Sequence, residues 1–181
     1  MKIRDLHVLV VLLLLAGCGY HHPASRPAEV GAISIHAATW ENRTNEIALE
    51  GFLLQKTADW LQQSRLFRLE VDPNRADYLL SGTIMSVNNP ATAYNSGDRA
   101  TTLKAWMKVS YHLTARATGK PLWEVNDTVR ERSFLAGEDA VRNRSNKEEA
   151  LAVIADELAE QIYLKLLTSL SEATVEETKL K

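Results

Sequence analysis

The chain contains one cysteine, and the residues before it make that cysteine the clearest place to expect chemistry. Cys18 stands alone among 181 residues and ends the sequence Leu-Ala-Gly-Cys at positions 15–18. Lys2 and Arg4 precede a short apolar run over residues 8–16, and this order is typical of a secretory signal peptide. The run is shorter than the roughly 20 residues that a membrane-spanning helix needs. We therefore expect export and cleavage rather than a membrane span.

Cys18 has no second cysteine with which to form an internal disulfide. The sequence Leu-x-Gly-Cys after an apolar run resembles the lipobox of bacterial lipoproteins, in which cleavage leaves the cysteine as the first residue and its thiol is acylated. We expect residues 1–17 to be the removed signal peptide and Cys18 to carry lipid. Several acyl chains, at about 0.8 kcal/mol per buried CH₂, would give a stable membrane anchor. The alternative is a secreted protein with an unpaired thiol.

No group of residues indicates catalysis. The sequence lacks a Gly-x-Ser-x-Gly elbow, a phosphate-binding glycine loop and a His-Glu-x-x-His zinc helix. His36 and His112 stand alone on predicted strands, so we interpret both as structural or surface residues. We therefore expect no enzyme activity, no cofactor and no bound metal. The formal net charge of −2 also argues against nucleic-acid binding, which requires a basic excess.

The candidate binding residues lie on a predicted hairpin. Residues 103–116 alternate strictly between apolar and polar, which predicts a strand with one buried face, and the turn at 118–121 leads into a return strand. We expect Trp123, Val125 and Val129 of the return strand to face the core. The candidate ligand-binding residues on the opposite face are Lys104, Trp106, Lys108, Arg130 and Arg132. Cations beside an aromatic ring suit an anionic, amphipathic ligand such as a phosphorylated lipid, and the alternative is an ordinary solvated surface.

Two predicted helices must cover the other face of that hairpin. The first is expected after Thr44 as N-cap, with an apolar stripe at spacings of three and four (Ile47, Gly51, Leu54, Ala58 and Leu61). The second is expected to begin at a capping box over residues 145–148 and has its own stripe (Leu151, Ile154, Leu158, Ile162 and Leu166). Further strands are predicted at 30–37, 65–71 and 76–88, followed by a long polar loop at 89–101.

The element order β-α-β-β-β-β-α predicts an α+β fold, a two-layer α/β sandwich with two helices packed on one face of a mostly antiparallel sheet. We expect this domain to span residues 30–168. Residues 18–29, with two prolines and no periodicity, are predicted to form a short tether behind the lipid. The polar residues 169–181 are predicted to form a flexible tail.

Several short motifs together resemble the LptE family of lipopolysaccharide-assembly lipoproteins. They cover nearly all of the chain after residue 17, in order. They are Cys-Gly-Tyr-His at 18–21, Trp-Glu-Asn-Arg-Thr at 40–44, Leu-Glu at 49–50, Ala-Asp-Tyr-Leu-Leu-Ser-Gly-Thr-Ile at 76–84, Tyr94 with Asp-Arg-Ala at 98–100, Leu-Trp-Glu at 122–124 and the final capped helix. No single motif is decisive, and the resemblance depends on their joint order.

The resemblance implies an outer-membrane lipoprotein on the periplasmic side that sits as a plug in an LptD-like β-barrel and binds lipopolysaccharide. It also implies an α/β sandwich without catalytic residues or a cofactor. Gly19 agrees with an outer-membrane location, because lipoproteins kept in the inner membrane typically carry Asp there. The alternative is a periplasmic regulator lipoprotein, for example an activator of peptidoglycan synthases. The tether spans at most about 35 Å, which favours the plug.

Overall fold

The computed structural model describes residues 31–179, with side chains described through residue 170. The predicted signal peptide at 1–17, the predicted lipidation site Cys18 and the predicted tether to residue 29 lie outside the described residues. The elements are β1 (Ile33–Ala37), β2 (Glu41–Asn42), α2 (Leu49–Gln63), β3 (Phe67–Leu69), β4 (Tyr78–Asn88), β5 (Ala91–Tyr94), β6 (Ala100–Ala115), β7 (Lys120–Leu135) and α3 (Ala140–Lys179).

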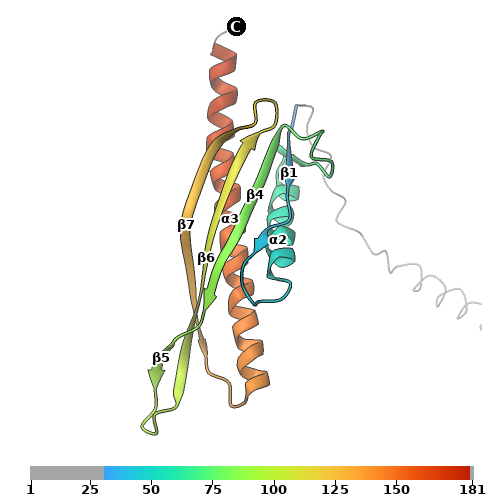
Figure 1. Ribbon diagram of the computed structural model, residues 1–181. Helices are drawn as coiled ribbons and strands as arrows, with labels where there is room; N and C mark the ends of the chain where they lie inside the picture. The colour runs from blue at the N-terminus through green and yellow to red at the C-terminus, as the bar shows by residue number, and fades with distance from the viewer. Residues whose placement is uncertain (1–30, 180–181) are drawn as a thin grey trace, which may run out of the picture.

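The strands form a single mixed sheet with the order β3-β1-β4-β6-β5, in which β2 pairs with β4 and β7 pairs with β6. β1 runs parallel to both of its neighbours, and α2 makes the crossover that parallel strands require. The long pairings β4–β6 and β6–β7 are antiparallel. Both helices lie on one side of the sheet, and α3 runs along β7 and most of β6 (Figure 1). The predicted two-layer α+β sandwich is therefore confirmed.

The core lies between α3 and the inner face of the central strands. The predicted stripe of α3 is confirmed: Leu151, Ile154, Leu158, Ile162 and Leu166 are all at most 4% exposed. The alternation predicted for β6 is confirmed as well, since its alternate residues are buried in one core cluster with α3 (Ala105, Met107, Val109, Tyr111 and Leu113). Within residues 31–179, neither helix carries the apolar stretch that a membrane span requires.

The start of α2 differs from the prediction. The helix begins at Leu49, and its N-cap is Ala48 in the left-handed conformation, with φ 64° and no side-chain cap. Thr44 is not the cap, because its hydroxyl accepts the Glu46 N–H within a local turn, at 3.1 Å. The predicted stripe is only partly right: Leu61 is buried and Leu54 packs at the edge of the core, but the other fully buried residues are Leu49, Leu53 and Thr57. Ile47, which we expected on the core face, is 97% exposed.

The two ends of α3 also differ from the prediction. The helix begins at Ala140, and a carboxylate oxygen of Asp139 accepts the Arg142 N–H at 2.8 Å, as an N-cap does. The predicted capping box at 145–148 therefore lies inside the helix. At the other end α3 continues to Lys179, past residue 168 where we placed the end of the domain and into the stretch predicted as a flexible tail.

The predicted loop at 89–101 contains parts of two strands. β5 pairs with the beginning of β6, which starts at Ala100, so only residues 95–99 remain as the turn between them. Asn95 organises that turn, because its side-chain oxygen accepts the N–H groups of Gly97 and Arg99.

Candidate binding surfaces

The register of the β6–β7 hairpin divides the predicted cations between two faces of the sheet. Residues directly opposite each other in an antiparallel pair point to the same face. Arg132 lies opposite Ala105 and Arg130 opposite Met107, both of which are core residues. Arg130 and Arg132 therefore lie on the helix side of the sheet. Our prediction that they share a face with the hairpin lysines is wrong.

A β-bulge in β7 places Arg130 and Arg132 on the helix side. Between the pairs Val109–Thr128 and Tyr111–Val125, β7 advances three residues while β6 advances two. Asp127 takes up the extra residue with φ 55°, the left-handed region that Asp and Asn tolerate better than other non-glycine residues. Beyond a bulge the alternation of a strand is reversed. Val129, expected in the core, is consequently 44% exposed on the outer side.

Lys104, Trp106 and Lys108 do lie together on the outer face, which neither helix covers (Figure 1). Lys104 Nζ lies 2.8 Å from Glu131 Oε1, and Lys108 Nζ lies 2.8 Å from Asp127 Oδ1. Both lysine side chains are 35% exposed, and such surface pairs contribute little stability. The outer face therefore carries charges that are already paired, with the half-buried Trp106 between them.

On the inner face, polar contacts join β7 to α3. Arg130 donates to the side-chain oxygen of Gln161, and Arg132 Nη1 lies 3.5 Å from Glu157 Oε1. Further along, Trp123 donates from its indole nitrogen to Ser169 Oγ at 3.0 Å. Arg130 and Arg132 thus hold an edge strand against a helix, a structural role that the sequence pattern did not reveal.

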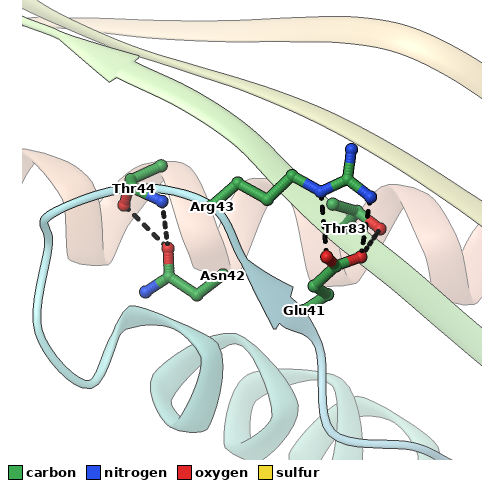
Figure 2. Close-up of polar contacts among 5 residues, drawn as sticks. All are labelled: Glu41, Asn42, Arg43, Thr44 and Thr83. Carbon is green, nitrogen blue, oxygen red and sulfur yellow. Dashed lines mark hydrogen bonds and ion pairs between the residues drawn. The ribbon is translucent and has the colours of Figure 1, made fainter.

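The Trp-Glu-Asn-Arg-Thr motif at 40–44 forms a second polar group (Figure 2). Arg43 donates to both carboxylate oxygens of Glu41, at 2.9 and 3.0 Å, and Thr83 of β4 donates to the same carboxylate at 3.3 Å. The hydrogen bond from Arg43 lowers the pKa of Glu41, and the carboxylate in turn raises the pKa of Arg43. These contacts tie β2 to β4, its neighbour in the sheet.

Asn42 points the other way and organises the turn before α2. Its side-chain oxygen accepts the N–H and the hydroxyl of Thr44, at 3.0 and 2.7 Å (Figure 2). Its amide nitrogen donates to the Glu46 carbonyl at 2.8 Å and to Glu50 Oε2 at 2.7 Å. The sequence drew attention to this motif only through the family resemblance, and the structure shows that it builds a rigid turn.

Among the described residues, no group of three or more His, Cys, Asp or Glu side chains is placed to hold a metal ion. What stands out over residues 31–170 is an uncovered sheet face with paired charges and a rigid turn. The fold and these surfaces define a small α+β sandwich with one sheet face uncovered by helices.

Residues 34–166 match the family model described as "LptE: Lipopolysaccharide-assembly", and the protein belongs to this family. It is a family of non-enzymatic assembly lipoproteins. The matched region includes all strands but for the first residue of β1, the whole of α2 and most of α3. A comparison with curated proteins gives no significant match.

Solved structures share the fold. A protein of Caulobacter crescentus CB15 described as a lipoprotein is 21% identical, with a TM-score of 0.54 over 76% of this chain and 90% of that chain. The rare lipoprotein B of Shewanella oneidensis is 12% identical, with a TM-score of 0.50 over 79% of this chain and 98% of its own. A Xanthomonas campestris protein is 11% identical, with a TM-score of 0.50 over 80% and 89%. At these identities the likeness concerns the fold alone.

Proposed function

We propose that this protein is an outer-membrane lipoprotein, anchored on the periplasmic side by lipid on Cys18, that binds lipopolysaccharide and sits as a plug in an LptD-like β-barrel. It performs this role without catalysis and without a cofactor. The observation that carries the proposal is the family match over residues 34–166, which includes nearly the whole sandwich.

The outer sheet face supports the plug role. A plug gives up much of its contact with water, and transferring unpaired charges out of water is costly. On this face Lys104 and Lys108 are paired with acidic residues of β7, and Arg43 is paired with Glu41. We propose that these paired charges lower the cost of enclosing this face within the barrel.

Lys104, Trp106 and Lys108 are the proposed lipopolysaccharide contacts, since they place two cations and an aromatic ring on one accessible strand. The proposed site excludes Arg130 and Arg132, because both lie on the opposite face of the sheet and contact α3. The shared chemistry of the three remaining residues is that of a site for phosphorylated, amphipathic molecules.

Co-purification from detergent-extracted outer membranes tests the function. Tagged full-length protein is expected to recover a large β-barrel protein and lipopolysaccharide, and depletion of the protein is expected to reduce lipopolysaccharide at the cell surface. The matched control is Cys18→Ala, which is expected to leave the membrane fraction. Protein that migrates alone, in cells whose envelope is unaffected by depletion, would refute the proposal. Recovery of a peptidoglycan synthase in place of a barrel would favour the regulator.

A further inference from the structure

An isoleucine is held out into solvent on the turn between β2 and α2. Ile47 is 97% exposed, the most exposed of the large apolar side chains described in the structure. The next residue, Ala48, has φ 64°, a left-handed conformation that is unfavourable for any residue with a β carbon. Backbone strain of this kind persists only where the surrounding structure imposes it, and it gathers at functional sites.

Two contacts of the preceding residue, Glu46, hold the turn in place. Asn42 holds the Glu46 carbonyl at 2.8 Å, immediately before Ile47. Glu46 also forms an ion pair with Lys147 of α3 at 2.8 Å, and these two side chains are only 24% and 21% exposed. Because the turn is tied to both β2 and α3, Ile47 is presented in a fixed position. A partner that covers it has little conformational entropy to remove.

A cleft of about 540 Å³ lies beside this turn, between the start of α2 and α3. Its apolar lining comes from Leu49, Phe52, Leu151 and Ala152. Its polar lining comes from Glu46, Lys147, Arg144 and Glu148. The volume is within the range of about 300–1,000 Å³ that is typical of ligand pockets. We call the turn and this space together the Ile47 cleft.

The charges of the Ile47 cleft indicate the kind of occupant. Two basic and two acidic side chains line it, and one of each already forms the Glu46–Lys147 pair. A polyanionic glycolipid headgroup would meet two carboxylates there. An apolar protein side chain with polar neighbours would instead contact the apolar floor of the cleft, and its neighbours would face a rim with equal numbers of basic and acidic side chains.

We propose that the Ile47 cleft is a protein-docking site, in which Ile47 and the cleft floor receive an apolar segment of the barrel partner. The inference rests on the proposed function for the existence of that partner. It adds a contact at the α2–α3 side of the sandwich, away from the outer sheet face (Figure 1). Ile47 takes the part of an interface anchor, a residue whose burial contributes far more than its neighbours do.

Photo-crosslinking in cells tests the docking site. A photoreactive phenylalanine analogue is placed at position 47 and, as a matched control, at position 71, where Val71 is 85% exposed on the turn before β4. We expect an adduct from position 47 whose fragments identify the same β-barrel that unmodified protein co-purifies, and none from position 71. An adduct with lipopolysaccharide instead, or no adduct while the barrel is still recovered, would overturn the inference and leave the proposed function standing. Failure of the unmodified protein to recover any barrel would overturn both.

A binding measurement gives the contribution of Ile47 to the affinity for the barrel. Ile47→Ser is expected to weaken association with the purified barrel about tenfold, whereas Val71→Ser leaves it unchanged. Ala152→Phe, which fills the cleft floor from α3, is expected to weaken association as well. Ile47 is exposed and Ala152 lines the cleft, so the thermal unfolding of both variants is expected to remain close to that of the wild type. Equal affinities of Ile47→Ser and Val71→Ser would contradict the docking role.

Discussion

Gly82 lies where the indole of Trp40 crosses β4, and replacing this glycine gives a quantitative test of the packing behind the motif at 40–44. A β carbon built on Gly82 lies 2.6 Å from Cε3 and 2.7 Å from Cη2 of Trp40. Trp40 is itself only 2% exposed and is packed beside Tyr111, with ring centroids 6.1 Å apart. The indole therefore has no free space into which it can retreat.

The expected cost of Gly82→Ala follows from two opposed effects. Inserting a methyl group into a packed core costs about 1–3 kcal/mol, while removing a strand glycine returns about 0.5–1 kcal/mol. Because the added β carbon lies closer than 3.0 Å to ring atoms, the upper part of the steric range applies, about 2–3 kcal/mol. The net loss is then about 1–2.5 kcal/mol, or a melting temperature lower by about 2–10 °C for a chain of this size. Gly82 does not have a positive φ, so the loss is steric and not conformational.

Urea unfolding of the chain starting at residue 19 measures this loss. The control is Gly51→Ala in α2, whose added methyl group meets nothing within 4 Å and is expected to stabilise the helix. Adding Trp40→Phe to Gly82→Ala should recover part of the steric cost, so that the two changes are not additive. A loss from Gly82→Ala below about 0.5 kcal/mol, or strict additivity, would refute the packing argument.

Three other measurements test the remaining contacts. Hydrogen bonds from Ser34 lower the pKa of Asp77 below its ordinary 3.8, so the carboxylate stabilises the fold above that pH and loses this effect as the pH falls. Asp77→Asn should therefore destabilise the chain at pH 7 and much less at pH 3, and an equal difference at both would contradict this reasoning. Asp139→Ala removes the α3 cap and should cost about 1 kcal/mol in urea unfolding; no change would mean that the cap is elsewhere. Changing Lys104 and Lys108 together to Gln should weaken lipopolysaccharide binding several-fold at low salt and less at high salt; unchanged affinity would leave the outer face as an ordinary solvated surface.

The sequence predicted those elements whose pattern is long and unbroken. The alternation of β6 and the stripe of α3 each extend over many residues, so a local irregularity does not obscure them. Together they fix the two layers and the face on which the helices pack. Apart from Cys-Gly-Tyr-His at 18–21, the motifs behind the family resemblance lie in the region that the family model matches, residues 34–166.

The errors arose where one residue changes the phase or the end of an element. A bulge at Asp127 reverses the faces of β7, and periodicity alone does not show where a strand gains a residue. The pair Asn126–Asp127 in mid-strand was the available signal, because both residue types tolerate the left-handed region. Similarly, Thr44 has the right side chain for a cap, but Asn42 engages its hydroxyl in another turn. Ile47 was wrongly predicted on the core face because it lies in this turn and not in the helix, which begins at Leu49.

The bulge in β7 also bears on how the protein behaves without a partner. β7 pairs on one side only, with β6, and presents a long open edge of 16 residues. A flat edge of this length is a template for pairing with other copies and for aggregation. Three features interrupt this edge. Pro121 lacks a backbone N–H, and Asp127 bends the strand. The Arg130 side chain donates a hydrogen bond to the Val129 carbonyl at 2.9 Å. The same residue that turns two arginines toward α3 thus interrupts the edge and helps to keep single molecules apart in solution.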